Sequence, residues 1–468
     1  MAATFHVENF GCRAARADGE AVADHLNAAG HCERQPAEAD LVIVNTCSVT
    51  AEADRSARAF IRRAHRQNPS ARIVVTGCYA QRAPEELAAL PGVAAVVGNS
   101  HKALAPEIIL GLGQSPAQSS EALLSVESLL AGGSPAPIWA DGLFAHSLLE
   151  SAQVMPGTQT RPNLKIQEGC GNRCTFCVIP QTRGASKSLP EAAVLRQVEG
   201  FVAAGGNELV LSGINLGRWG RDFSSAEGVR RPSSLAGVVR TIFEETQLAR
   251  LRLSSIEPMD WDTELIGLMA EFGGSRLARH AHLPLQSGSD AVLRRMHRRY
   301  RPWHYAEKVA ALTEAAGGEL TLGADVMAGF PGESEAEFAE TLALIEALPF
   351  GYLHLFPFSP RPGTAGWALH AERPVPAEAV EERMKLLRRL ATEKSRRHRS
   401  RFIGRELEAI TLHTPAEIAA RKRSAALTEN FLPVEIEGRQ EANRLLRLRV
   451  KGLNAEGTLE AVLVEKSS

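Results

Sequence analysis

Strand and helix signals alternate regularly along the chain between about residues 160 and 360. Apolar runs that fit buried strands recur six times, at 164–167, 208–212, 251–254, 281–285, 320–326 and 352–356. Helical stretches fit between them, for example at 190–204, 303–316 and 335–347. Six consecutive β/α units predict a parallel sheet curled into a partial TIM-like barrel. In such barrels the chemistry lies at the carboxyl ends of the strands.

Three cysteines follow the first of these strands with the spacing C-x3-C-x2-C, at Cys170, Cys174 and Cys177. Three thiolates in one loop can hold one inorganic centre, but they are one ligand short of a fully ligated iron–sulfur cluster. An open position is the arrangement of catalytic metal sites. The alternatives are a zinc knuckle or three unrelated thiols, and a zinc ribbon would need a second C-x2-C or a histidine pair. Neither follows, which argues against a zinc ribbon, so an iron–sulfur centre is the leading interpretation and three unrelated thiols are the alternative.

The N-terminal part of the chain, up to about residue 111, also alternates strands and helices. Expected strands are 4–7, 41–44 and 73–75, and expected helices are 20–29, 51–67 and 84–90. Cys12, Cys47 and Cys78 each come shortly after one of these strands. Ligand sites in open parallel sheets gather at the carboxyl ends of strands, so these cysteines should converge, although chance placement of buried thiols is the alternative. Cys32 lies between a helix and the next strand and is interpreted as incidental.

Composition excludes several classes of protein. The 468 residues are 44% hydrophobic, and the formal net charge of −1 says nothing for or against nucleic acid. No apolar run reaches the length of a membrane span, and the start of the chain lacks the pattern of a signal peptide. A cytoplasmic location is therefore expected. Seven cysteines in a long chain of this kind predict reduced thiols rather than disulfides.

The C-terminal part predicts a basic helix and a small antiparallel β-barrel. The window 381–405 holds ten Lys or Arg and three Glu, a net +7, which indicates either a solvated helix face or phosphate contacts. Short β-like runs follow at 407–412, 431–436, 445–450 and 458–464. Phe431 is the main candidate for stacking on a base. The expected domains are 1–111 (α/β), 112–158 (linker), 159–396 (barrel) and 397–468 (small barrel).

Further motifs follow the remaining strands of the central barrel, at 211–220, 254–258, 282–290, 325–333 and 358–364. With two cysteine triplets in this order, the chain resembles the methylthiotransferases of the radical S-adenosylmethionine superfamily. Its C-terminal part resembles their TRAM domain. The resemblance covers nearly the whole chain apart from the linker.

The resemblance implies two [4Fe–4S] clusters and S-adenosylmethionine as cofactors. Cys170, Cys174 and Cys177 would hold the cluster whose fourth iron binds S-adenosylmethionine, and Cys12, Cys47 and Cys78 would hold a second. It places Phe176 beside the adenine of S-adenosylmethionine. Asn215 and Glu257 are plausible contacts to the same cofactor from their strand-end positions, or structural hydrogen bonders. No general acid or base can be assigned. tRNA and an electron donor of the flavodoxin or ferredoxin kind are the implied partners, and no membrane is.

The implied activity is addition of a methylthio group to C2 of N6-threonylcarbamoyladenosine at position 37 of tRNA. This rests on Gly11-Cys12-Arg13, on the loop 213–217 and on the stretch 426–433. The family usually has an Asn two residues after the Arg13 position, where this chain has Ala15. The alternatives are action on isopentenyladenosine 37 or on an aspartate of a ribosomal protein. From another class, a non-catalytic iron–sulfur protein that carries electrons or binds RNA also fits the cysteines.

Overall fold

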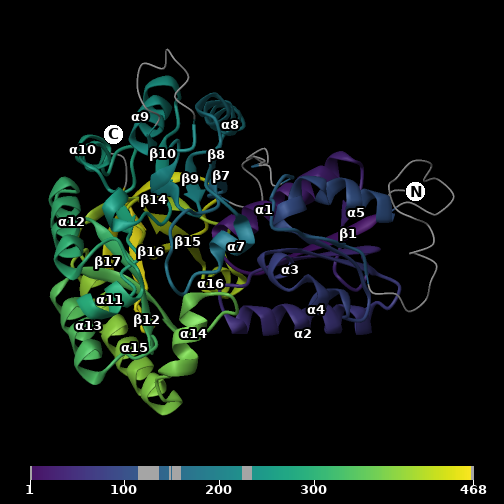
Figure 1. Cartoon of the computed structure of the whole chain (residues 1–468). Helices are drawn as coiled ribbons and strands as arrows, with labels where there is room; N and C mark the ends of the chain where they lie inside the picture. The colour runs from purple at the N-terminus through teal and green to yellow at the C-terminus, as the bar shows by residue number, and fades with distance from the viewer. Residues whose placement is uncertain (1–2, 114–135, 147–148, 150–159, 224–233, 465–468) are drawn as a thin grey trace. The chain divides into compact units, whose positions relative to one another are not determined.

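The computed structural model describes residues 3–113, 136–146, 149, 160–223 and 234–464 (Figure 1). The chain forms two compact units. The first contains Met1–Gln153, Gln167–Lys187 and Ser359–Thr364, and the second contains Val154–Ile166, Ser188–Phe358 and Ala365–Ser468. Among the described residues, no helix is both long and apolar enough to span a membrane.

The first unit is built on a parallel six-stranded sheet with the order β2-β1-β3-β4-β5-β6. The strands are β1 (Thr4–Asn9), β2 (Cys32–Glu33), β3 (Leu41–Thr46), β4 (Arg72–Gly77), β5 (Val93–Gly98) and β6 (Ile138–Trp139). The three predicted strands are confirmed. β2, β5 and β6 were not predicted, and β6 lies inside the expected linker. Within that linker the structure describes residues 112–113, 136–146 and 149. The other residues of the linker lie outside the described part of the chain.

Helices cover both faces of this sheet. One face packs on α2 (Ala51–Gln67), α3 (Cys78–Arg82) and α4 (Pro84–Ala88), and the other packs on α1 (Arg13–Ala28) and α5 (Ala105–Gly113). Alternate residues of β3 therefore serve two cores, with Val42 and Val44 on the first face and Leu41 and Ile43 on the second. The expectation that the first helix begins near residue 20 is wrong, because α1 begins at Arg13, directly after Cys12.

The second unit contains the predicted partial barrel. Its strands form two sheets, in the orders β10-β9-β7-β8 and β11-β12-β13. A hydrogen bond from the amide of Ile256 to the carbonyl of His282 joins the two sheets. The strands are β7 (Asn163–Glu168), β8 (Lys187–Ser188), β9 (Glu208–Gly213), β10 (Arg250–Leu253), β11 (His280–His282), β12 (Thr321–Ala328) and β13 (Phe350–Pro357). The last two residues of β7 and the first residue of β8 belong to the first unit. All six predicted strands are confirmed, and so is the α/β class.

The helices of the barrel follow its strands in the chain. They are α8 (Glu191–Ala203), α9 (Leu235–Glu245), α10 (Thr263–Phe272), α11 (Asp290–Arg295), α12 (Pro302–Ala315), α13 (Glu335–Ala347) and α14 (Ala365–Glu372). α13 has the bounds that the sequence predicts because Ser334 and Glu337 form a reciprocal capping box at its start.

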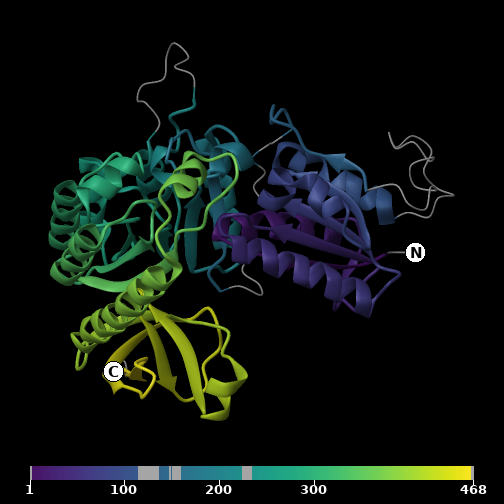
Figure 2. The same cartoon turned by 60° about the horizontal axis from the view of Figure 1, so that its bottom comes forward.

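The C-terminal strands close into a five-stranded barrel in the order β14-β15-β16-β18-β17. They are β14 (Glu406–Thr411), β15 (Arg423–Thr428), β16 (Pro433–Glu437), β17 (Leu445–Leu453) and β18 (Leu459–Leu463), with α16 (Ala416–Ala420) between the first two. Four of the pairs are antiparallel, as predicted, and the pair β16–β18 is parallel. β15 was missed. Figure 2 shows this barrel in yellow beside the long helix α15 (Ala377–Ser400).

The interpretation of Phe431 as a base-stacking residue does not fit its surroundings. The residue has a φ of 68° and precedes β16 rather than belonging to it. Its ring centroid lies 4.2 Å from that of His280 and 5.4 Å from that of Tyr352. The guanidinium of Arg252 lies 5.2 Å from the same ring. Phe431 therefore packs the small barrel against the first residues of β11 and β13.

Candidate functional site

Three cysteines meet at one edge of the sheet in the first unit. Cys12, Cys47 and Cys78 follow β1, β3 and β4, which are neighbours in the sheet, so the carboxyl ends of parallel strands bring the cysteines together. Burial, and then the nearby thiols of Cys78 and Cys12, raise the pKa of Cys47 to about 12. The expected convergence of this triplet is therefore present in the fold.

Glycines before two of these cysteines make the close approach possible. A Cβ on Gly11 would lie 2.4 Å from the Cβ of Cys47 and 2.7 Å from its Sγ. A Cβ on Gly77 would lie 2.3 Å from the carbonyl oxygen of Thr46. Both glycines have a positive φ, 105° and 97°, that other residues rarely adopt. Only glycine lets the loops after β1 and β4 lie against the loop after β3.

The second triplet lies in a loop closed at its base. The loop leaves β7 at Gly169, and the amide of Cys170 donates to the carbonyl of Gly184, 3.1 Å away. Within it, the amide of Cys177 donates to the carbonyl of Cys174, and the amide of Asn172 donates to the Sγ of Cys170, 3.4 Å away. The short helix α7 (Ile179–Arg183) ends the loop. This loop belongs to the same compact unit as Cys12, Cys47 and Cys78.

Arg183, at the end of this loop, reaches the first triplet. Its Nε donates to the Sγ of Cys78 at 3.2 Å, and its Nη1 pairs with Asp18 at 2.9 Å and Glu168 at 2.6 Å. Lys102 pairs with both carboxylates. Burial alone would lower the pKa of Arg183, but Cys78, Glu168 and Asp18 raise it well above its usual value. A permanent positive charge therefore lies against the sulfur of Cys78.

Cys78 is the most enclosed of the three thiols of its triplet. Asn99 Nδ2 donates to its sulfur at 3.5 Å and to the carbonyl of Thr182 at 2.8 Å. Burial raises the pKa of Cys78, and Arg183 opposes that rise. Asn99 and Arg183 thus connect the end of the second cysteine loop to the first triplet at two points.

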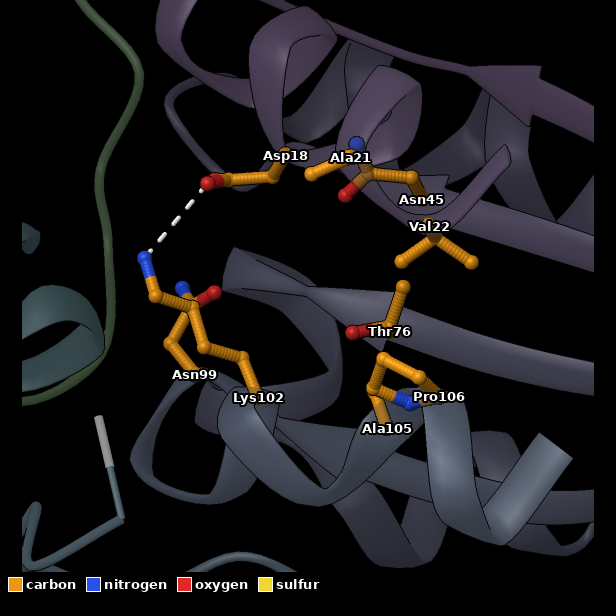
Figure 3. Close-up of a pocket in the computed structure, with 9 residues that line it drawn as sticks. All are labelled: Asp18, Ala21, Val22, Asn45, Thr76, Asn99, Lys102, Ala105 and Pro106. Carbon is orange, nitrogen blue, oxygen red and sulfur yellow. Dashed lines mark hydrogen bonds and ion pairs between the residues drawn. The ribbon is translucent and has the colours of Figure 1, made fainter. Parts of the chain in front are cut away.

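A small cavity of mixed polar and apolar lining lies in the first unit, as Figure 3 shows. It measures about 30 Å³ and is lined by Asp18, Ala21, Val22, Asn45, Thr76, Asn99, Lys102, Ala105 and Pro106. In Figure 3, Asp18 and Lys102 face each other across one side of it. That volume suits about two water molecules and excludes a nucleoside. The cavity is therefore not the place where a substrate base binds.

The residues around both triplets fit iron–sulfur clusters. Thiolates are the usual protein ligands of such clusters, and each triplet provides three. Nη2 of Arg183 is buried and has no hydrogen-bond partner among the described residues. A buried cationic donor beside Cys78 suits an anionic sulfur centre, whose sulfur atoms accept hydrogen bonds. Cys32, by contrast, is exposed at the amino end of β2, away from the carboxyl ends of the strands.

The three residues expected at S-adenosylmethionine occupy different surroundings. Phe176 is half-buried in the cysteine loop of the first unit. Asn215 and Glu257 belong to the second unit, where each follows a strand, β9 and β10. Asn215 is buried, and Glu257 forms an ion pair with Arg298. Their role at the cofactor stays a prediction.

Sequence reasoning missed four charged residues and one asparagine that organise this region. Arg183, Glu168, Asp18, Lys102 and Asn99 belong to no motif that the sequence singled out. One signal was present, since Glu168 is an acidic residue at the end of a buried strand, where an unpaired carboxylate is costly.

A further ion-pair cluster lies near Cys47 in the first unit. Asp54 accepts from Arg361 at 2.5 Å and from Arg82 at 2.8 Å, and Ser48, next to Cys47, also donates to it. Arg361 comes from the loop after the sixth barrel strand, which the sequence associated with the barrel. The structure places the segment 359–364 in the first unit instead.

Two protein families match parts of the chain. Residues 4–98 match the family described as uncharacterized protein family UPF0004, and residues 164–345 match the Radical SAM superfamily. The first range holds Cys12, Cys47 and Cys78, and the second holds Cys170, Cys174 and Cys177.

Curated relatives align along nearly the whole chain. The threonylcarbamoyladenosine tRNA methylthiotransferase MtaB of Bacillus subtilis is 34% identical, over 94% of this chain and 91% of its own length. The tRNA-2-methylthio-N(6)-dimethylallyladenosine synthase of Erythrobacter litoralis is also 34% identical, over 88% of this chain and 87% of its own. Among solved structures, the radical S-adenosylmethionine methyltransferase TsrM from Kitasatospora setae aligns with a TM-score of 0.51 and 16% identity, over 76% and 72% of the two chains. At that identity the structural likeness shows the fold alone.

Proposed function

This chain belongs to the methylthiotransferases of the radical S-adenosylmethionine superfamily, and we propose that it adds a methylthio group to C2 of N6-threonylcarbamoyladenosine at position 37 of tRNA. The observation that carries the proposal is the presence of both cysteine triplets in one compact unit, where Arg183 links the loop of one triplet to Cys78 of the other. A protein that only carried electrons would not need a cysteine loop with an open position beside a second set of thiols.

In this proposal the two triplets hold two different [4Fe–4S] clusters. Cys170, Cys174 and Cys177 hold the one that also binds S-adenosylmethionine, and Cys12, Cys47 and Cys78 hold the other. When bound, these cofactors supply a carbon-centred radical and a sulfur-bearing group, which an unactivated C–H bond requires. Arg183 and Asn99 both donate to the Sγ of Cys78 and would hold that thiolate in place for the second centre. Both residues are buried, so they exclude water from that side.

S-adenosylmethionine is proposed to contact Phe176, Asn215 and Glu257. The half-buried ring of Phe176 lies between Cys174 and Cys177 in the sequence, where it can pack on an adenine. Asn215 and Glu257 follow barrel strands, where ligands of such barrels bind. Because Glu257 already pairs with Arg298, its carboxylate is held in one orientation. The proposal also includes a flavodoxin- or ferredoxin-like electron donor and a cytoplasmic location.

The second candidate is methylthiolation of N6-dimethylallyladenosine. A relative of that name from Erythrobacter litoralis matches this chain at 34% identity, the same value as the relative from Bacillus subtilis. The two reactions use the same cysteines and differ only in the group on N6 of the adenine. The nature of that group must therefore be tested with the nucleoside itself.

Iron content tests the two-cluster assignment. Anaerobically reconstituted protein should hold about eight irons per chain, and Cys47→Ala should reduce this to about four. Cys32→Ala is the matched control, since Cys32 is exposed in the same unit, and it should keep all the iron. A wild-type protein with only four irons, unchanged in Cys47→Ala, would contradict the second cluster.

The nucleosides of tRNA test the substrate. Mass spectrometry of tRNA from a deletion strain should show loss of the methylthio group from threonylcarbamoyladenosine, with dimethylallyladenosine derivatives unchanged. Complementation with the wild-type chain should restore it, whereas Cys177→Ala should not. Loss of the methylthio group from the dimethylallyl nucleoside instead would establish the second candidate.

A further inference from the structure

A second group of possible metal ligands lies in the second unit, on three neighbouring strands of the barrel. His282 ends β11, Asp325 lies on β12 and His354 lies on β13. Their ligand atoms all lie within 4.8 Å of one another. The second unit contains no cysteine, because all seven fall within the first unit. This group is therefore chemically separate from the two cysteine triplets.

The strand register brings these three side chains to one face. Asp325 is opposite His354 in the pair β12–β13, and His282 is opposite Gly323, two residues before Asp325. The alternate residues Leu322, Ala324 and Val326 are fully buried, so the other face of β12 is covered. Along the shared face, exposure of the side chains rises from 8% at His282 through 25% at Asp325 to 62% at His354. The group is held at one side and open to solvent at the other.

Both imidazoles point at the same carboxylate but at different oxygens. Nε2 of His282 lies 3.2 Å from Oδ2 of Asp325, and Nδ1 of His354 lies 3.3 Å from Oδ1. A carboxylate that lies between two imidazoles is a ready set of oxygen and nitrogen donors.

Tyr352 orients the buried histidine from behind. Its hydroxyl lies 3.1 Å from Nδ1 of His282 and 2.8 Å from Nε2 of His280. When Nδ1 of His282 carries the proton, it donates to Tyr352, which in turn donates to His280, and the lone pair of Nε2 faces Asp325. Metal-binding histidines characteristically have such a partner on the second nitrogen. A cation can therefore replace the hydrogen between His282 and Asp325 by a tautomer change alone.

We propose that His282, Asp325 and His354 bind one divalent first-row transition-metal ion. Two imidazoles and one carboxylate form the facial set that such ions accept, and no thiolate competes within this unit. The exposed side, at His354, leaves coordination positions open to oxygen or nitrogen atoms of a ligand. The site uses no residue of either cysteine triplet, so its metal content can be measured independently of the proposed activity.

Zinc binding to the reconstituted enzyme tests this site. Protein with both cysteine sites filled is dialysed anaerobically against Zn²⁺ and then against metal-free buffer, and zinc and iron are counted together by mass spectrometry. Wild type should retain about one more zinc per chain than His354→Ala or Asp325→Asn, with equal iron in all three. Tyr352→Phe should keep the site but weaken its affinity at least about tenfold.

Two features keep the test decisive. His354 is exposed, so His354→Ala leaves the fold intact even if Asp325→Asn does not. Glu340→Gln, which removes an exposed carboxylate of the same unit, should retain the zinc of wild type. Equal zinc in wild type and His354→Ala would overturn the proposal, and so would loss of zinc in Glu340→Gln.

Discussion

At the scale of single residues, Arg183 connects most of the polar groups around the first cysteine triplet. Its guanidinium donates to Cys78 through Nε and pairs with Asp18 and Glu168 through Nη1, two positions that the single nitrogen of an ammonium cannot occupy together. Because it is fully buried, its charge must be matched, and the two carboxylates match it. The residue is a positioning residue for Cys78 rather than a ligand.

Arg183→Lys should separate charge from geometry. The lysine keeps the positive charge but cannot hold Cys78 and both carboxylates together, so iron should fall from about eight toward about four per chain. Iron analysis and the electron paramagnetic resonance spectrum of the reduced protein measure this. Arg16→Lys, which changes an exposed i,i+4 pair with Glu20, serves as the control. Full iron with an unchanged spectrum would show that Arg183 has no role at the cysteines.

His398 makes one part of the second unit sensitive to acid. Its Nε2 lies 2.9 Å from Oγ1 of Thr321, and burial, with Arg401 and Arg399 nearby, lowers its pKa to about 4. An unfolded chain would protonate it near pH 6.5, so between the two values the unfolded state binds more protons. The stability that this group contributes is therefore complete above about pH 6.5 and declines as the pH falls toward 4.

Acidification should consequently weaken the C-terminal end of α15. From pH 7.5 to 5.5 the free energy of local opening should fall by about 1 kcal/mol, on the scale of about 1.4 kcal/mol per pH unit below 6.5. Amide hydrogen exchange of α15 and β13 measures this. His398→Gln can still bond to Thr321, and its free energy of local opening should be the same at both pH values. His370→Gln on α14 should show the same decrease as wild type. The same pH effect in His398→Gln would exclude this histidine as its cause.

At the scale of secondary structure, α15 divides its basic residues between two tasks. Arg383 is buried and pairs with Glu333 at 2.8 Å, and Lys394 donates to the carbonyl of Glu346 at 2.7 Å. Four other basic residues of α15 are exposed and form no ion pair within the described part of the chain, namely Arg388, Arg389, Arg396 and Arg397. The net charge of +7 in the window 381–405 thus overstates the number of basic side chains that are exposed for contact with phosphate. The interpretation as a phosphate-binding helix stays a prediction that rests on the four exposed arginines.

Replacing these four arginines by Gln should weaken tRNA binding without unfolding the protein. Each lost phosphate contact should reduce the slope of log affinity against log salt by about 0.7 to 0.9. Filter binding at several salt concentrations measures the slope. Arg383→Gln is the contrasting variant, because it leaves Glu333 buried without its partner and should cost about 3 to 5 kcal/mol of stability. Unchanged tRNA binding in the fourfold variant would leave only the solvated-face interpretation.

At the scale of the whole molecule, the second unit joins two barrels through specific contacts rather than through a tether. Arg279 pairs with Glu429 at 2.5 Å, and Asn207 Nδ2 donates to the carbonyl of Asn443 at 2.8 Å. Phe431 packs on His280 and Tyr352 between these contacts. The small barrel is therefore part of the folded body of this unit, as the contact pattern of the chain also indicates.

Phe431→Ala should uncouple the small barrel from the larger one. Loss of the ring should cost about 3 kcal/mol and split a shared thermal transition in two, which calorimetry would show. Leu463→Ala, on the outside of the small barrel, is the control and should leave one transition. If Phe431→Ala instead left the transition unchanged and weakened RNA binding, the earlier base-stacking interpretation would be restored.

Local patterns account for what could be predicted. α2 and α13 have the predicted bounds, and the six barrel strands lie within a few residues of the predicted ones, because periodicity and capping act over a few neighbours. The short strand β2 and the strand β15 were missed, since neither carries a strong apolar alternation. The start of α1 was missed because its first turn, Arg13-Ala-Ala-Arg16, has no side-chain cap.

The sequence alone determined the two cysteine triplets, the succession of β/α units and the family resemblance, because each depends on spacing along the chain. Tertiary structure decided which side chains surround those cysteines. Arg183 is 105 residues from Cys78, and Arg361 is 307 residues from Asp54, and nothing in local sequence pairs them. Such pairs form only when packed strands bring distant loops together and a buried charge must find its partner there. The grouping of His282, Asp325 and His354 on one face depends in the same way on the register of three strands.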